Sequence, residues 1–422
     1  MNKDNKNNYY LKRYTFTFII VILLMIVFLL MEKSIPNEKS RRNILKSEKY
    51  YHEYFDHQFS NINIIKNKHE TVDVTADLYH LSMIYLEDNK HLWKSFIEMN
   101  KDSEISQKMI RKESFRSIKI DSDYSRYWNG QLIILKPLLS FFTMSTIYNI
   151  YLVIFTIIFS ILLFMIFKHS KLLAIIFTIS FMIINAFFVT TCDNLMYDFM
   201  ISMISSIILI KMYENKSQNI DLLFLITGML TVYFDHITCE TLTLTLPLFI
   251  FFYFNMTDNK SINNKLIIKF IILWLLGYCF TFCMKWILVV IHYHGKFIEK
   301  IIDPMMIRIY YEKENIFSVF LNSLKELPNY WYPFGYYSIK IILLIFSILL
   351  LLYLIIKDKK KRQYYLCFLL TATIPLIRYF VLSSHSNYHN YFTYRAFLPF
   401  IMMILLCIIL GTKKIFKDFL IH

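Results

Sequence analysis

Long apolar runs recur along this chain of 422 residues, and they restrict its fold more than any other feature. Each run of about 18 or more apolar residues can cross a hydrocarbon core roughly 30 Å thick as one α-helix. Inside lipid every backbone polar group needs an internal partner, so these runs are expected to be helices and not open strands. The chain is 56% hydrophobic and has only 6 Gly and 8 Pro, which is unlike a typical soluble enzyme. The sequence therefore predicts an all-α integral membrane protein.

Hydropathy predicts about ten transmembrane helices, with boundaries good to a few residues. A first span at 14–31 follows a basic N-terminus, and no small-residue cleavage site comes after it, so we interpret it as an uncleaved span. The stretch 132–144 is short for a span and is interpreted as an interfacial or re-entrant helix. The other spans are expected at 146–167, 172–190, 195–212, 220–236, 240–255, 264–291, 339–356, 363–382 and 394–412.

The spans divide the chain into five predicted parts. In the part at 32–130, apolar residues recur at helical spacing, which predicts short amphipathic helices lying on the membrane or on the bundle. These apolar residues are Ile44, Leu45, Tyr51, Tyr54, Phe55, Leu78, Leu81, Ile84 and Tyr85. The parts are a cytoplasmic N-terminus with the first transmembrane helix (1–31), a large extracytoplasmic loop (32–130), a transmembrane bundle (131–291), a second extracytoplasmic loop (292–338), and C-terminal transmembrane helices with a basic cytoplasmic tail (339–422).

The formal net charge of +15 is concentrated in short segments between apolar runs. Loops expected inside carry Lys and Arg, as in 357–362, whereas the short outer loops near 191–194, 237–239 and 383–393 carry none. This is the positive-inside bias of membrane proteins. It predicts a multi-pass plasma-membrane protein with both termini in the cytoplasm, and it argues against nucleic acid as the partner.

The cysteines and histidines show no metal-ligand spacing. Six cysteines lie within or at the ends of apolar runs and are interpreted as small apolar residues. Cys192 and Cys239 are both expected at the outer face, which leaves a disulfide between them open. His52, His57 and His69 lie in the first outer loop without a tight ligand pattern, so no metal site is predicted there.

Ionisable residues within or beside spans are functional candidates by default, and here they gather at the expected outer face. They are Asp121, Asp123, Arg126, Asp193, Asp235, His236, Glu240, His385, His389 and Arg395. Arginine grips phosphate bidentately and a carboxylate can act as a general base, so this mixture suits an anionic substrate. Two neighbouring carboxylates could also hold a divalent cation against a diphosphate, which leaves a cation open as cofactor.

Asp193, and two further charged residues within spans, Arg378 and Lys285, have other interpretations. Asp193 could cap the helix that follows it. Arg378, near the outer half of its span, could extend outward or pair with a carboxylate. Lys285 comes closest to a charge within a span, and a water-accessible position for it near the midplane would favour a transporter.

Three short patches and the overall plan resemble known membrane proteins. Residues 124–130 (Tyr-Ser-Arg-Tyr-Trp-Asn-Gly) with 135–139 (Leu-Lys-Pro-Leu-Leu) are similar to an RYWHGY…RPLL stretch in multi-spanning proteins of low-GC Gram-positive bacteria. Residues 233–238 and 385–395 resemble further stretches of that group. An inner N-terminus, one span, a long outer loop with acidic residues and then a bundle resemble the GT-C superfamily of membrane glycosyltransferases.

The GT-C resemblance implies an activity and site roles. It implies transfer of a sugar from a polyprenyl-phosphate carrier, outside the membrane, to cell-envelope glycan. It would make Asp121 or Asp123 the base that activates the acceptor hydroxyl, and it would place His385, His389 and Arg395 near the carrier phosphate. This chain differs in carrying the Asp pair late in the first outer loop. The alternatives are a flippase or transporter for a lipid-linked saccharide, a polysaccharide polymerase, or a structural envelope protein.

Overall fold

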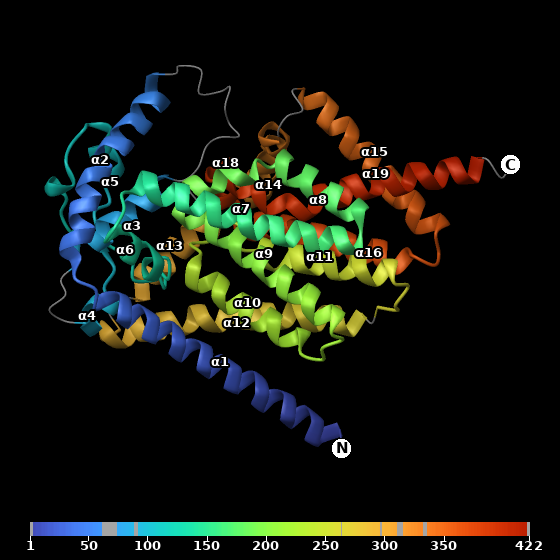
Figure 1. Cartoon of the computed structure of the whole chain (residues 1–422), viewed down its shortest axis with the longest axis horizontal. Helices are drawn as coiled ribbons and strands as arrows, with labels where there is room; N and C mark the ends of the chain where they lie inside the picture. Colours follow the sequence, from blue (N-terminus) through green and yellow to red (C-terminus); the bar gives the residue numbers. More distant parts are fainter. Residues whose placement is uncertain are drawn as a thin grey trace.

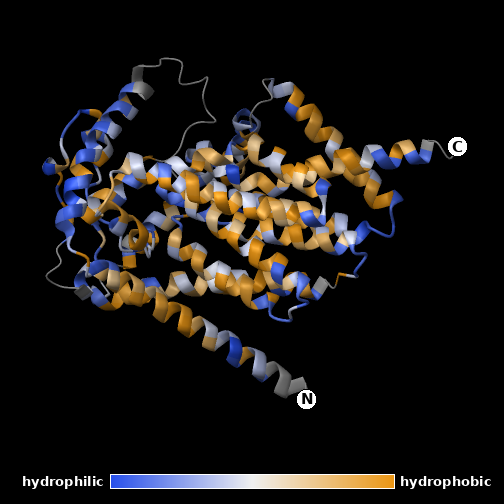
Figure 2. Cartoon of the chain, viewed as in Figure 1, coloured by the Kyte–Doolittle hydropathy of each residue, from blue (hydrophilic) through white to orange (hydrophobic). Residues whose placement is uncertain are grey.

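The described part of the protein is mainly helical, in agreement with the predicted all-α fold class (Figure 1). The structure is a computed structural model that describes residues 3–60, 74–87, 92–262, 264–295, 298–309, 315–331 and 336–419. In that part of the chain the only strands are β1 (Asn100–Lys101) and β2 (Ser122–Asp123), which pair antiparallel with Asn100 opposite Asp123. The apolar helices form a bundle, and hydrophilic residues gather at its two ends (Figure 2).

Seven of the described helices are long and apolar enough to cross a membrane. Most of them match the expected spans to within a few residues, whereas the first, at 3–33, is much longer than the span expected at 14–31. They are α1 (Lys3–Lys33), α7 (Met144–His169), α9 (Asp193–Glu214), α12 (Asn264–His292), α15 (Tyr337–Lys357), α16 (Arg362–Val381) and α19 (Leu398–Phe419).

Three further expected spans are shorter apolar helices, namely α8 (Lys171–Ile183), α10 (Ile220–Phe234) and α11 (Leu242–Thr257). The 15 residues of α10 extend only about 22 Å at 1.5 Å per residue. The stretch expected as one span at 172–190 is interrupted, since Asn185 takes a left-handed φ of 49° and η3 (Ala186–Thr191) continues beyond it. The structure therefore supports seven spans, and the total of about ten stays a prediction.

The first polar loop folds into helices at one end of the bundle (Figure 1). Its apolar residues Ile44, Tyr51, Leu78, Leu81 and Ile84 are buried. The helix at 74–86 has no exposed residue, so it is covered on all sides, whereas an amphipathic helix would expose one face. Helix α2 packs on α7 and α3 packs on α9, so these faces lie against the bundle. The elements are α2 (Asn37–Ser60), α3 (Val74–Leu86), α4 (Leu92–Ile97), α5 (Ile105–Ile110), η2 (Phe115–Ser117) and the short α6 (Leu132–Leu139).

Four buried charges join the end of α1 to this loop. Lys136 Nζ lies 2.9 Å from Glu87 Oε2 and 3.3 Å from Glu32 Oε1. Lys33 Nζ lies 3.2 Å from Glu32 Oε2 and 3.5 Å from Glu87 Oε1. Two lysines and two glutamates alternate, so each buried charge has two opposite neighbours, as burial of charge requires.

A second group of short helices lies between α12 and the last span. These are α13 (Ile298–Ile309), α14 (Ile316–Glu326), η4 (Leu327–Tyr330), α17 (Ser383–Tyr388), α18 (Asn390–Thr393) and η5 (Tyr394–Phe397). Both α13 and α14 pack on α17. Of the aromatic cluster expected at 329–337, Tyr330 and Trp331 are buried and Tyr336 is exposed, while residues 332–335 lie outside the described part.

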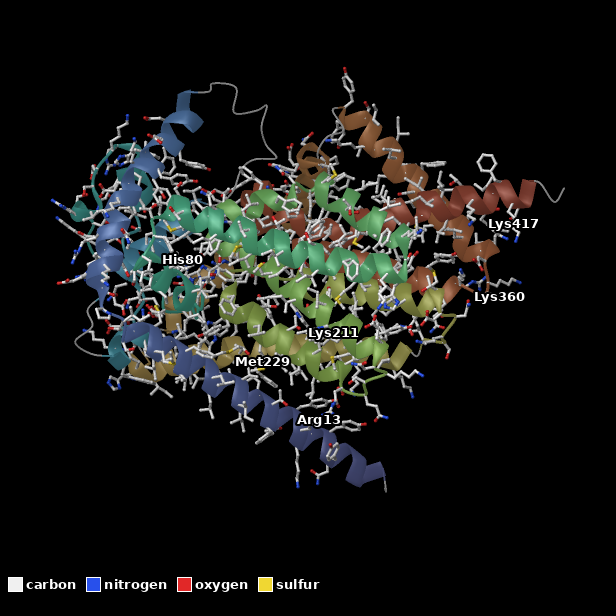
Figure 3. All side chains as sticks on the ribbon, in the orientation of Figure 1. Arg13, His80, Lys211, Met229, Lys360 and Lys417 are labelled. Carbon is white, nitrogen blue, oxygen red and sulfur yellow. The ribbon has the colours of Figure 1, made fainter. Side chains whose placement is uncertain are left out.

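Both termini lie at the end of the molecule away from α2 (Figure 1). Lys360 and Lys417 lie toward that end, whereas His80 lies toward the other (Figure 3). The loops expected to be cytoplasmic therefore gather at one end of the bundle and the polar candidates at the other. This arrangement is the one the charge pattern predicts, and the membrane side of each end stays a prediction.

Candidate functional site

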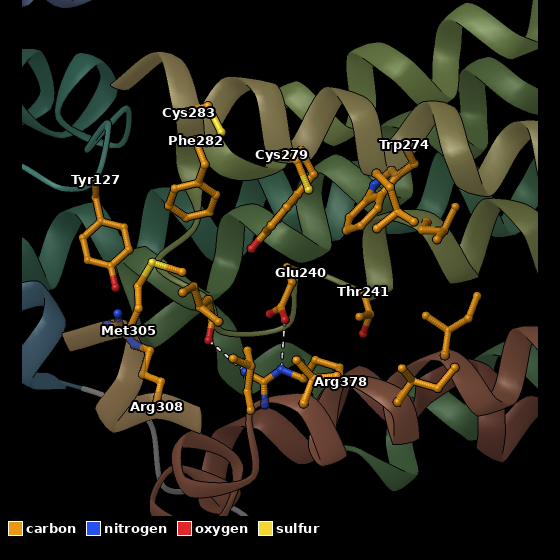
Figure 4. A pocket seen from close by; sticks show the side chains of 18 of the residues that line it. Tyr127, Glu240, Thr241, Trp274, Cys279, Phe282, Cys283, Met305, Arg308 and Arg378 are labelled. Atoms are coloured by element: carbon orange, nitrogen blue, oxygen red, sulfur yellow. Dashed lines mark hydrogen bonds and ion pairs between the residues drawn. The ribbon is translucent and has the colours of Figure 1, made fainter. Parts of the chain in front are cut away.

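An apolar cavity of about 520 Å³ lies between α12, α13 and α16 (Figure 4). Helix α12 supplies Trp274, Tyr278 and Phe282 to its wall, and isoleucines of α13 and α16 complete it. The polar side chains that line it are Arg126, Glu240, Thr241, Arg308 and Arg378, together with the hydroxyl of Tyr127 and the thiols of Cys279 and Cys283. A largely apolar pocket with a few converging polar groups is the usual form of a ligand site.

Arg378 is fixed by hydrogen bonds on every side of its guanidinium group. Its Nε donates to Glu240 Oε1 at 2.9 Å, and Nη1 donates to Ser386 Oγ at 2.9 Å. Nη2 donates to the carbonyl of Ile237 at 3.0 Å and lies 3.2 Å from His385 Nδ1. Arg378 thus ties α16 to the connection between α10 and α11. Of the two interpretations of Arg378, an outward extension and a carboxylate pair, the structure shows the pair.

Arg126 and Arg308 meet at the same end of the cavity, over the ring of Tyr127. Their guanidinium carbons lie 5.0 and 5.3 Å from its centroid. The Nε of Arg126 is buried and has no hydrogen-bond partner among the described residues. In that same part of the chain, neither arginine forms a salt bridge with a carboxylate. Two arginines without acidic partners beside an apolar cavity can bind an anion.

Two buried carboxylates, Asp198 and Asp235, lie behind Glu240, in and beside the connection between α10 and α11. The hydroxyl of Thr238 lies 2.9 Å from Asp198 Oδ2 and 2.6 Å from Asp235 Oδ1. Asp235 also accepts from the backbone N–H of Thr238. Burial, and then the neighbouring Glu240 carboxylate, raise the pKa of Asp235 to about 7. Like charges at close range favour holding a proton within this group.

His236 lies between the arginines and a second buried histidine. Its ring centroid is 4.7 Å from that of Tyr127 and 5.1 Å from that of His80. His80 Nδ1 lies 3.0 Å from Asp193 Oδ2, and both side chains are fully buried. Tyr151 donates to the other oxygen of Asp193 at 2.7 Å. Asp193 therefore pairs with a histidine. It is the first residue of α9, and the N-cap residue is Cys192, not Asp193 as the sequence had suggested.

The last outer segment supplies two more histidines. His385 touches Arg378, and its ring centroid lies 4.6 Å from that of His389. Burial, followed by the charge of Arg378, lowers the pKa of both imidazoles, that of His389 to about 4. Both are therefore neutral near pH 7. Arg395 is fully buried, stacks on Tyr394 at 4.7 Å and does not line the cavity.

Asp121 and Asp123, the predicted catalytic pair, lie on and beside β2 and do not line the cavity. Asp121 accepts from both the N–H and the hydroxyl of Ser103, at 2.8 and 2.7 Å. Asp123 accepts from the N–H of Ser125 at 2.6 Å and from the hydroxyl of Tyr293 at 2.7 Å. In this structure both carboxylates hold the loop that carries Arg126, and their catalytic role stays a prediction.

The other sequence expectations concern metals, disulfides and Lys285. Among the described residues no group of three His, Cys, Asp or Glu side chains is arranged to hold a metal ion. None of the six cysteines, all of them described, forms a disulfide, so the bond left open between Cys192 and Cys239 is not present in this structure. Lys285 is fully buried, 3.5 Å from the carbonyl of Phe96, and it does not line the cavity. His69 lies outside the described residues.

Comparison with known proteins found no matching family model, no matching curated protein and no matching solved structure. One fold can carry many activities, so the function depends on the side chains of the site. Of the predicted site residues, Arg126 and Glu240 line the cavity, and His236, Asp235, His385 and His389 surround its polar end.

Proposed function

We propose that this protein binds a polyprenyl-phosphate-linked sugar in the cavity and transfers the sugar to cell-envelope glycan at the outer face of the plasma membrane. One observation supports this proposal above all. The cavity is apolar along α12 and α16, Arg126 and Arg308 meet at one end of it, and Arg378, which is paired with Glu240, also lines it. An isoprenoid phosphate has the same division, with an apolar chain and an anionic head. Arginine binds phosphate oxygens through paired, charge-assisted hydrogen bonds.

Buried carboxylates beside the arginines favour a reaction over simple binding. Transfer needs a group that accepts the proton of the attacking hydroxyl, and a buried carboxylate or imidazole can do so. Glu240 lines the cavity with one oxygen, Oε2, that has no hydrogen-bond partner among the described residues. Asp235 lies close behind it, and His236 lies beside Tyr127 and the two arginines at the end of the cavity. In the proposed site, phosphate binding and proton transfer therefore take place within one cluster.

Binding of undecaprenyl phosphate tests the proposal. The full chain in nanodiscs should bind this lipid, and Arg126→Gln and Arg308→Gln should each weaken binding about 10- to 100-fold, as expected for loss of a hydrogen bond to a charged group. Arg116→Gln, an exposed arginine of η2, is the matched control and should leave affinity unchanged. Undecaprenol, which lacks the phosphate, should bind all variants alike.

Two results would refute this assignment. One is wild-type affinity for undecaprenyl phosphate that is no higher than its affinity for undecaprenol. The other is equal binding by the wild type and both arginine variants. Once binding is established, the donor sugar is found by offering undecaprenyl-phosphate-linked sugars of different kinds and measuring released undecaprenyl phosphate.

A further inference from the structure

His80 is held in one tautomer by Asp193. The carboxylate can only accept hydrogen bonds, so the His80 Nδ1 atom at 3.0 Å carries the proton and donates. Asp193 is itself held, since its backbone N–H donates to Asp77 at 2.9 Å and its other oxygen accepts from Tyr151. The free lone pair of His80 is therefore on Nε2. That atom is buried and has no hydrogen-bond partner among the described residues.

His236 is the ring that lies between His80 and the cavity. Its own Nε2 is also buried without a partner in the described part of the chain. Tyr124 and Tyr127 hold it from the other side, at 5.3 and 4.7 Å between ring centroids. Tyr127 lines the cavity, and so does Ile237, the residue that follows His236 in the chain. Asp193, His80 and His236 thus lie in contact one after another, from the protein interior to the end of the cavity where Arg126 and Arg308 meet.

We propose that His236 is the proton acceptor of this site and that His80, oriented by Asp193, is the positioning residue that shares its proton. The inference rests on the proposed function. In the transfer, the acceptor oxygen forms a bond to the anomeric carbon while the bond from that carbon to the phosphate oxygen breaks. The electron pair of the broken bond stays on the phosphate, which the arginines hold. The hydroxyl proton goes to the imidazole pair, where the Asp193 carboxylate stabilises the added charge.

The surroundings of His236 couple this proton to phosphate binding. The groups that face it are His80 from α3, Arg126 with Tyr124 and Tyr127 from the loop, and Arg308 from α13. Burial lowers the pKa of His236 well below 6.5, and His80, Arg126 and Arg308 lower it further in that order. A bound phosphate offsets the charge of both arginines. It therefore raises the pKa of His236 and favours uptake of a proton.

Affinity measured as a function of pH tests this coupling. The probe is undecaprenyl phosphoryl-glucose, a phosphodiester that keeps one charge across the range, with the full chain in nanodiscs. The His236 pKa is higher in the complex than in the free protein, so the affinity gain is complete below the free pKa and is lost as pH rises through the bound pKa. Between the two values, wild-type affinity should rise up to about tenfold for each pH unit lowered.

Four variants decide the outcome. His236→Gln and His236→Asn should bind with no pH dependence in that window, and Asp193→Asn should reduce the slope without abolishing binding. His169→Asn is the matched control: this histidine pairs with Glu214 at the opposite end of the bundle and should keep the wild-type slope. Binding by His236→Gln with an unchanged slope would overturn the inference while leaving the proposed function intact. Failure of the wild type to bind either lipid phosphate would overturn both.

Discussion

Replacing Arg378 by methionine should lower the free energy of unfolding by about 3–5 kcal/mol, the usual cost of leaving one partner of a buried ion pair alone. The side chains of Arg378 and Glu240 are only 5% and 6% exposed, and their atoms Nε and Oε1 are 2.9 Å apart. At an effective dielectric constant of 20 their attraction is about 6 kcal/mol, which the cost of desolvating both charges largely offsets. The variant keeps the cost of burying Glu240 and loses the attraction.

A double-mutant cycle with Glu240→Gln measures this pair directly. Glu240→Gln in the methionine background removes the unpaired charge, so the double variant should be more stable than the sum of the two single changes implies, by up to about 3 kcal/mol. Unfolding in mixed micelles, followed by tryptophan fluorescence, gives the free energies. Arg42→Met breaks the exposed pair with Glu38 and serves as the control, with no measurable change expected. If Arg378→Met is no more destabilising than Arg42→Met, the reasoning from burial is refuted.

Three further changes test other parts of the structure by the same unfolding measurement. Gly228→Ala places a Cβ 2.2 Å from a backbone oxygen of α12 and should cost about 1–3 kcal/mol, whereas Gly411→Ala meets only a flexible side chain and should cost less. Lys136→Met leaves two buried glutamates to Lys33 alone and should cost about 3–5 kcal/mol. Burial lowers the pKa of Lys101 from 10.5 to about 8, so the folded protein favours the neutral amine. Wild-type stability should then rise from about pH 8 to 10.5, a rise that Lys101→Met should abolish.

The long apolar helices were predictable because the hydrocarbon core of the membrane sets both the apolar composition and the length of a helix that crosses it. The expected span at 264–291 and helix α12, Asn264–His292, differ by one residue at one end. Hydropathy does not indicate where the backbone turns. For this reason α8, Lys171–Ile183, is shorter than the span expected at 172–190. There Ile183 ends the helix before the left-handed Asn185, although the apolar sequence continues. Such a break depends on tertiary contacts of the following segment and leaves no periodic signal.

The site was predictable in its location but not in all its members. Charges placed beside spans had to meet at one end of the bundle, and Arg126, Glu240 and His236 do so. His80 was missed because it stands in an apolar helix, α3, where a single histidine is unremarkable. The signal that identifies it is its contact with Asp193, which is 113 residues away in the sequence. Only the fold brings these two together.

The charge balance of the cavity is the strongest physical reason to expect an anionic ligand. Three arginines and one carboxylate line it, so the lining carries two more positive charges than negative ones. Uncompensated charge beside an apolar wall is costly, and it persists where function requires it. The phosphodiester of a lipid-linked sugar carries one negative charge and would offset half of this excess, and the phosphate monoester released after transfer, with about −1.5 to −2 charge at pH 7, would offset most of it. A neutral lipid would leave it unbalanced, so the arginines favour an isoprenoid phosphate over an isoprenoid alcohol as the natural occupant.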